Sequence, residues 1–398
     1  MYHIIYHKDK KMGWRMKKII LSLVLACLIL TGCGKHDQKE VLKEFQNKVN
    51  TADSYFLTGE MELVNNEDVY NYNINVSYKK DDFYKIELVN AVNDHKQVIL
   101  RNTEGVYIVT PSLNKSFKFQ SDWPYNNSQV YLLSSLLDDI SNDENRTFED
   151  SSEGYIFTSS VNYPNNEKLV NQKVYFGKDY LPKKVEVLDA DGNPQITMNF
   201  SKIDLRTEFN DTYFDLNSVL DTNNMDNTDN KNTTDNTENK NNNTTDNNSN
   251  SKTNSNNQNS NTTPTETQEP SNSSSEGENK TKETATIDDI IYPMYLPANT
   301  YLTSQERVNT EDGERLILTF TGDSSFVLME EVAKYSSVPE IIPTYGAPEL
   351  IGSSLAVIND NSANWFDNGI EYYLVSDVMK TDELLQVVRS ISVLPVSK

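Results

Sequence analysis

Residues 70–78 read Tyr70-Asn71-Tyr72-Asn73-Ile74-Asn75-Val76-Ser77-Tyr78, so aromatic or aliphatic side chains alternate with polar ones over nine positions. Successive side chains of a strand point to opposite faces of a sheet, and this period of two therefore predicts a strand with one wet face. Such alternation is typical of antiparallel sheets, because they can leave one face to solvent. We therefore expect an antiparallel β-sheet around this segment.

The flanking sequence extends the pattern in both directions. Apolar residues at helical spacing predict one helix over Val41–Val49, before the sheet, and a second over Tyr131–Ile140. Further strands are expected at Tyr84–Leu88, Val106–Val109, Phe117–Phe119, Tyr155–Val161 and Val174–Phe176, and as a hairpin of Val185–Val187 with Ile196–Phe200. Together these elements predict one long antiparallel sheet with two helices packed on one side. The fold class is α+β, an unclosed half-barrel with an apolar concavity and a helical lid.

The N-terminal residues have the organisation of a secretory signal peptide. Lys17-Lys18 precede the apolar run Ile19–Leu30, and Leu30-Thr31-Gly32-Cys33 follow. The last four residues resemble the bacterial lipobox, and the resemblance implies that Cys33 is lipidated and becomes the first residue of the mature protein. The alternative, a membrane helix, needs about 20 apolar residues, which is longer than this run. We expect translation to start at Met16, with Met12 as the alternative.

Composition excludes several classes of function. The net charge of −23 argues against a nucleic-acid partner, because phosphate backbones need a basic surface. The two cysteines are Cys27, inside the signal peptide, and Cys33, so no disulfide is expected. The histidines are His3, His7, His36 and His95. Only His95 belongs to a region expected to fold, which argues against a metal site and against nucleophilic triads. We expect no cofactor and no enzymatic activity, although carboxylate-only chemistry stays open.

A low-complexity stretch divides the chain. Between Asp221 and Thr284 the one apolar residue is Met225, and the Asn, Thr, Ser and Asp residues around it predict disorder. The stretch is either a spacer that lets the second domain move or a linker whose sequence has drifted without a function of its own. The expected organisation is a leader and signal peptide at 1–32, a lipidated tether at 33–37, a first domain at 38–220, a linker at 221–286 and a small α+β domain at 287–398.

The second domain also shows alternation. Leu316–Leu328 predicts a hairpin around Gly322-Asp323, and Trp365–Ile370 predicts a turn that leads into a strand at Tyr372–Val375. A helix is expected from Asp382, with Thr381 as its N-cap. The arrangement resembles the small α+β domain that ends many anti-sigma-factor and sporulation lipoproteins.

The first domain resembles a known family. The order of its elements, together with Phe117–Pro124 and Tyr180–Val187, is similar to that of the LolA/LolB/RseB-type lipoprotein carriers. Within that superfamily it is most similar to the Gram-positive sporulation and germination lipoproteins of the YdcC and GerS type. The resemblance implies an unclosed barrel that binds acyl chains, lipoproteins or a partner protein. Because a protein anchored at Cys33 cannot diffuse as a carrier, sensing or scaffolding is favoured over transport.

Two groups of aromatic residues are candidates for the binding site. Tyr70, Tyr72 and Tyr78 share one strand face and could line a concavity that grips glycan or acyl chains. The alternative is that they only pack the sheet, since aromatic residues favour strands. The second group, Trp123, Pro124 and Tyr125, is either a lid loop at the mouth of the groove or a turn before the second helix.

Three functions compete at this stage. The first is a non-enzymatic lipoprotein on the outer face of the cytoplasmic membrane that binds a hydrophobic ligand or a partner protein. The family resemblance implies a role in sporulation, germination or envelope maintenance, with a cell-wall amidase as one candidate partner. The second is an RseB-like sensor of envelope state that contacts a membrane regulator. The third, a carboxylate-based wall hydrolase, has the least support.

Overall fold

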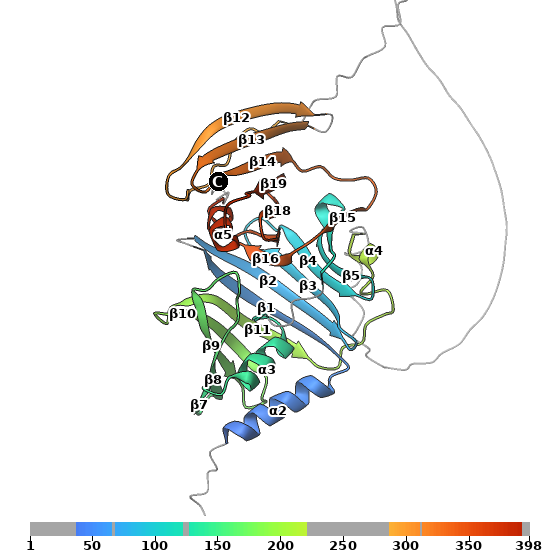
Figure 1. Cartoon of the computed structure of the whole chain (residues 1–398). Coiled ribbons are helices and arrows are strands. Elements are labelled where there is room, and N and C mark those ends of the chain that lie inside the picture. The colour runs from blue at the N-terminus through green and yellow to red at the C-terminus, as the bar shows by residue number, and fades with distance from the viewer. Residues whose placement is uncertain (1–36, 66–67, 122–126, 221–285, 311–312, 392–398) are drawn as a thin grey trace, which may run out of the picture. The chain divides into compact units, whose positions relative to one another are not determined.

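The computed structural model describes residues 37–65, 68–121, 127–220, 286–310 and 313–391 (Figure 1). The predicted signal peptide, the predicted lipidation site Cys33, the candidate lid residues Trp123–Tyr125 and nearly all of the predicted linker lie outside these residues. The described residues before and after the linker belong to one compact unit. We call residues 37–220 the N-terminal region and residues 286–391 the C-terminal region. None of the helices within the described ranges has the length and apolar composition needed to cross a bilayer.

The N-terminal region is built on a twelve-stranded sheet. Its strands are β1 (Ser54–Asn65), β2 (Asp68–Lys79), β3 (Phe83–Asn90), β4 (Lys96–Asn102), β5 (Gly105–Thr110), β6 (Lys115–Phe119), β7 (Thr147–Asp150), β8 (Tyr155–Ser160), β9 (Leu169–Phe176), β10 (Pro182–Asp189), β11 (Pro194–Asp204) and β15 (Glu340–Thr344). The strand order is β15-β6-β5-β4-β3-β2-β1-β11-β10-β9-β8-β7, so the sheet is open, with β15 and β7 at its edges. Neighbours are antiparallel except for β15, which comes from the C-terminal region and runs parallel to β6. The predicted fold class, an unclosed antiparallel sheet with helices, is confirmed.

Two helices pack on one face of this sheet, as predicted. Helix α2 (Gln38–Thr51) buries Val41 and Phe45, and helix α3 (Leu133–Asn142) buries an apolar face that includes Leu136 and Ile140. These side chains form one core with inward-facing strand residues such as Ile74. Spacings of three and four residues put the apolar side chains of each helix on a single stripe, and this stripe covers the sheet.

The opposite face of the sheet is covered over β4 and β5, which the sequence did not predict. Val98, Leu100, Tyr107 and Val109 point to this face and pack against the segment that ends in the short helix α4 (Leu216–Leu220). Ile99, between two of them, points into the main core. Strand β4 is therefore apolar on both faces, and this is why it shows no alternation.

The C-terminal region contains a seven-stranded antiparallel sheet and helix α5 (Thr381–Arg389). The strands are β12 (Thr300–Thr310), β13 (Gly313–Gly322), β14 (Phe326–Val332), β16 (Ala347–Ile351), β17 (Ser354–Ile358), β18 (Ser362–Asp367) and β19 (Ile370–Val375). Their order is β12-β13-β14-β19-β18-β17-β16. Residues of α5 such as Leu384 and Val388 pack with Trp365 in a second core. The predicted N-cap is wrong by one residue, because Lys380 takes this position and Thr381 is the first residue of the helix.

Candidate functional site

Three tyrosines from consecutive strands form the floor of a cavity of about 340 Å³. The register places Tyr78 of β2 opposite Tyr55 of β1 and opposite Tyr84 of β3. The ring centroids of Tyr55 and Tyr78 are 4.8 Å apart and those of Tyr78 and Tyr84 are 5.0 Å apart. Because the three rings come from cross-strand neighbours on one face, sheet pairing alone brings them together. We call this space the tyrosine cavity.

Mostly polar side chains surround the tyrosine floor. They come from the end of α2, the turn after β2, the segment before α3 and α3 itself: Val49, Asn50, Ala52, Lys80, Asp82, Asn127, Gln129, Leu132, Ser134, Ser135 and Asp138. Two of the lining charges are paired or close to an opposite charge, since Lys80 Nζ lies 3.6 Å from Asp53 and Asp82 lies 3.4 Å from Arg101. The cavity therefore has an aromatic floor and a hydrophilic rim.

The tyrosine hydroxyls of this cavity stay protonated at neutral pH. Burial, together with the nearby carboxylates Asp82, Asp81 and Asp53, raises the pKa of Tyr78. Burial also raises the pKa of Tyr84 to about 12. At the rim, burial raises the pKa of Asp138. The hydroxyls can therefore donate as well as accept hydrogen bonds, and the rings keep the electron-rich faces of neutral phenols.

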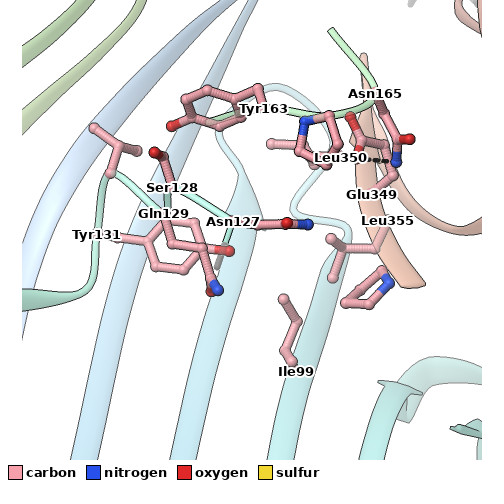
Figure 2. A pocket seen from close by; sticks show the side chains of 13 residues that line it. Ile99, Asn127, Ser128, Gln129, Tyr131, Tyr163, Asn165, Glu349, Leu350 and Leu355 are labelled. Atoms are coloured by element: carbon pink, nitrogen blue, oxygen red, sulfur yellow. Dashed lines mark hydrogen bonds between the residues drawn. The ribbon is translucent and has the colours of Figure 1, made fainter. Parts of the chain in front are cut away.

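A second, smaller cavity of about 110 Å³ lies where the two regions meet, and we call it the junction cavity. Figure 2 shows its lining residues, with Tyr131 and Tyr163 from the N-terminal region and Leu350 and Leu355 from the C-terminal region. Asn165 Nδ2 donates a hydrogen bond of 3.3 Å to Glu349, the interaction drawn as a dashed line. Asn127 and Gln129 line both cavities, so the segment that carries them separates the two.

Asp139 of α3 helps to hold this separating segment in place. Ser128 Oγ donates to one of its carboxylate oxygens at 3.0 Å, and Gln172 Nε2 donates to the other at 3.0 Å. Burial raises the pKa of Asp139 to about 6, although both hydrogen bonds favour its charged form. Ser128 also accepts a hydrogen bond of 2.7 Å from the backbone N–H of Asn162.

The C-terminal region covers another part of the sheet face. Leu355, Val357 and Phe366 belong to the same core as the N-terminal sheet, and the ring of Phe366 stacks on Phe117 of β6 at 5.2 Å. Gln97 of β4 is 3% exposed, and its side-chain oxygen accepts a hydrogen bond of 2.6 Å from the backbone N–H of Leu355. The neighbouring residue Trp365 points the other way, into the C-terminal core. The two regions therefore share one apolar core.

The structure separates the candidate residues that the sequence grouped together. Tyr78 lines the tyrosine cavity, whereas Tyr70 and Tyr72 are buried where the C-terminal region docks. Tyr72 donates a hydrogen bond to the carbonyl oxygen of Gly352, and a Cβ at Gly352 would lie 3.1 Å from the ring of Tyr70. Trp123, Pro124, Tyr125 and Cys33 lie outside the described residues, and a binding role for the tyrosines stays a prediction.

Sequence reasoning missed Tyr55, Tyr84 and the polar rim. A strand was predicted at Tyr84, but the position of this residue beside Tyr78 depends on the register of β2 and β3, which the sequence pattern did not reveal. His95 lies in the turn after β3, in agreement with the prediction of a loop residue, and burial lowers its pKa. Within the described ranges, no group of three or more His, Cys, Asp or Glu side chains is arranged to hold a metal ion.

Comparison with known proteins gives a consistent set of relatives. Residues 15–214 match the family model described as "Sporulation protein YdcC-like". The chain is 30% identical over 373 residues to "Sporulation protein YdcC" of Bacillus subtilis (strain 168), a match that covers 94% of this chain and 95% of that protein.

Solved structures with distant similarity were also found. One is the Pseudomonas aeruginosa MucA/MucB complex, with 12% identity and a TM-score of 0.30 over 88% of this chain and 97% of that chain. Another is the CwlD amidase of Clostridioides difficile in complex with the GerS lipoprotein, with 21% identity and a TM-score of 0.26 over 44% of this chain and 97% of that chain. A LolA superfamily protein of Nitrosomonas europaea matches with 11% identity and a TM-score of 0.27 over 45% of this chain and 98% of that chain.

Proposed function

Because the chain belongs to the family of YdcC-like sporulation proteins, we propose that it is a non-enzymatic lipoprotein that binds a partner protein or a hydrophobic ligand. In this proposal Cys33 carries the lipid and holds the protein on the outer face of the cytoplasmic membrane. The role is in sporulation, germination or maintenance of the envelope. A cell-wall amidase and a membrane regulator are the two candidate classes of partner.

The observation that carries the proposal is the distribution of free space on the sheet. The C-terminal region occupies the face near Tyr72, and the tyrosine cavity remains as the larger of the two spaces described above. A long acyl chain needs an extended apolar groove. In this protein, side chains of the C-terminal region occupy that part of the sheet face. The remaining cavity has a hydrophilic rim, which favours a partner protein over a purely apolar ligand.

Site-specific photocrosslinking in sporulating cells tests this proposal. A photoreactive amino acid at position 78 should give a discrete crosslinked protein band, and the same group at position 175, on β9 away from both cavities, should not. Crosslinks to lipid alone would support the hydrophobic-ligand form of the proposal. Equal labelling at both positions, with no discrete product, would contradict the assignment of the cavity as the binding site.

The anchor is tested separately. A metabolic fatty-acid label should attach to the wild-type protein and be lost in Cys33→Ala, and the variant should leave the membrane fraction. Retention of both label and membrane association in Cys33→Ala would exclude Cys33 as the lipidated residue.

A second candidate, the sensor, is favoured by one observation. The contacts between the regions include a 3.3 Å hydrogen bond from the Arg389 guanidinium to the backbone carbonyl oxygen of Asn165 and the buried Gln97–Leu355 hydrogen bond. A ligand that altered these contacts would change the surface offered to a regulator. Hydrogen exchange at Leu355 should then increase when partner-containing membranes are added, and unchanged exchange would argue against a sensor.

A further inference from the structure

The size of the tyrosine cavity limits what it can take. Its volume of about 340 Å³ lies at the lower end of the range for small-molecule sites, roughly 300–1,000 Å³. The space suits a single side chain or a small head group. If a partner protein docks here, as proposed above, it inserts one residue rather than a long segment.

The floor of the cavity is chemically suited to a cation. The three tyrosine rings stack on one another at centroid distances of 4.8 and 5.0 Å, so they largely cover one another's faces. Their hydroxyl oxygens can still accept hydrogen bonds from an ammonium group. Tyr55, which is 2% exposed, contributes a further feature, because its hydroxyl makes no complete hydrogen bond among the described residues. Burial raises the pKa of this hydroxyl and the backbone N–H of Leu133 lowers it, but that N–H does not meet the geometry of a hydrogen bond. A buried hydroxyl oxygen without a partner can accept a hydrogen bond from an N–H group of a ligand.

The charged side chains around the cavity also favour a cationic ligand. Asp82 and Asp138 line it, and Asp53 and Asp81 lie close enough to influence Tyr78. The cations nearby are Lys80, 3.6 Å from Asp53, and Arg101, 3.4 Å from Asp82. The four carboxylates therefore outnumber these two cations. Asp138 forms no ion pair in the part of the chain that the structure describes. The residual negative charge favours a positively charged occupant.

We propose that the tyrosine cavity binds an alkylammonium group, presented as a lysine side chain on the surface of a partner protein. The ammonium lies at the hydroxyl ends of the stacked tyrosine rings, donates to the Tyr55 hydroxyl and is neutralised by Asp138. This inference rests on the proposed function and specifies the chemistry by which the partner is recognised.

Titration of the full-length mature protein with a short lysine peptide tests the inference. The probe is acetyl-Gly-Lys-Gly-amide, its matched control is the same peptide with the lysine ε-amine acetylated, and binding is followed by ligand-observed NMR. We expect binding of the charged peptide alone, weaker at higher salt. Tetramethylammonium should compete only weakly, since it has no N–H group to donate to the Tyr55 hydroxyl.

Single substitutions distinguish a loss of the ammonium site from a general loss of folding. Asp138→Asn and Tyr78→Ala should each weaken binding of the lysine peptide at least about tenfold, a change of about 1.4 kcal/mol. Tyr78→Phe, which keeps the ring, should bind nearly as well as wild type. The controls are Asp191→Asn in an exposed turn and Tyr345→Ala, whose side chain is 72% exposed, and both should behave as wild type.

The outcomes distinguish this inference from the function on which it rests. Equal binding of the charged and acetylated peptides, or no effect of Asp138→Asn in a folded variant, would overturn the ammonium assignment. If the lysine peptide does not bind but position 78 still crosslinks to a protein, the partner-binding proposal survives and the lysine inference fails. If neither is observed, both fail.

Discussion

Strand β2 carries Tyr72 and Tyr78 on one face of the sheet, yet the two side chains have different surroundings. Tyr72 is 3% exposed and donates a hydrogen bond to the C-terminal region, 280 residues away in sequence. Tyr78 borders a cavity with a hydrophilic rim. The same residue type on the same strand therefore serves as internal packing at one end and as candidate binding surface at the other. What differs is the part of the chain that covers each end.

The comparison predicts the largest difference for truncation of the two rings. Tyr72→Ala should lower the free energy of unfolding by about 4 kcal/mol, because it leaves a hole in a closed core. Tyr78→Ala should lower it by only about 1 kcal/mol, since its ring already borders open space. Urea unfolding of both variants measures the difference. Similar losses for both would show that the two ends of β2 are equally packed.

A second way to disturb the closed end is to fill the backbone contact at Gly352. This residue has a φ of 58°, and a Cβ there would lie 3.1 Å from the ring of Tyr70. Gly352→Ala should cost about 3 kcal/mol, from left-handed strain of about 1–2 kcal/mol and the added crowding.

Gly192→Ala provides the matched control, because Gly192 has a φ of 84° but no atom within 4 Å of the position that a Cβ would take. It should show the strain alone, about 1 kcal/mol. Thermal unfolding compares the two variants. Equal losses of stability in the two variants would mean that the ring of Tyr70 moves aside for the new Cβ at no energetic cost.

The separating segment between the cavities gives a pH-dependent test. The folded protein holds the Asp139 proton up to about pH 6, whereas the unfolded chain releases it near its ordinary value of 3.8. The folded state therefore binds more protons in this window, and the free energy of unfolding falls as pH rises through it. The fall is on the order of 2 kcal/mol. Asp139→Asn should remove it, which urea unfolding at pH 4 and pH 7 would detect.

Asp138→Asn is the control on the same helix. Its carboxyl group lies at the rim of the tyrosine cavity, and its pKa is raised by burial alone, without the hydrogen bonds that Asp139 accepts. Since this side chain is exposed, its effect on the same pH dependence should be smaller. A larger effect of Asp138→Asn than of Asp139→Asn would mean that Asp138, at the rim, is the more strongly buried carboxyl group.

The smallest expected effect concerns single hydroxyl groups. Tyr72→Phe removes the donor to the Gly352 carbonyl oxygen and should cost about 1 kcal/mol. Tyr78→Phe should be nearly neutral. The difference between the two is measurable by urea unfolding, and a neutral Tyr72→Phe would mean that water replaces its hydroxyl at the junction.

Local patterns predicted much of the N-terminal region. The alternation at 70–78 identified β2, and the helical spacing of Val41–Val49 identified α2. Strand β4 escaped prediction because both its faces are buried, one in the main core through Ile99 and the other in the cluster with Leu100. A strand covered on both sides has no period of two to detect.

The candidate site was harder to predict than the fold, because its geometry depends on distant parts of the chain. The sequence showed that Tyr70, Tyr72 and Tyr78 share a face, but not that Gly352 would cover the first two. Neither did it show that Tyr55 would join Tyr78, since the pairing of β1 with β2 follows from a strand that was not predicted. Alternation gives the face of a residue, whereas its neighbour is fixed by tertiary pairing.

The parallel pairing of β15 with β6 has a consequence for biosynthesis. Ser121, just after β6, contacts Gly346, just after β15, and the two are 225 residues apart. A ribosome adds about 5–20 residues per second, so β6 exists for roughly 10–40 s before its partner is made. Throughout that interval an unpaired strand edge is available to other nascent copies. Once β15 arrives, Pro343 leaves one position of the new edge without an N–H donor. Chains that end before β15 should therefore keep the β6 edge unpaired and be more prone to aggregate.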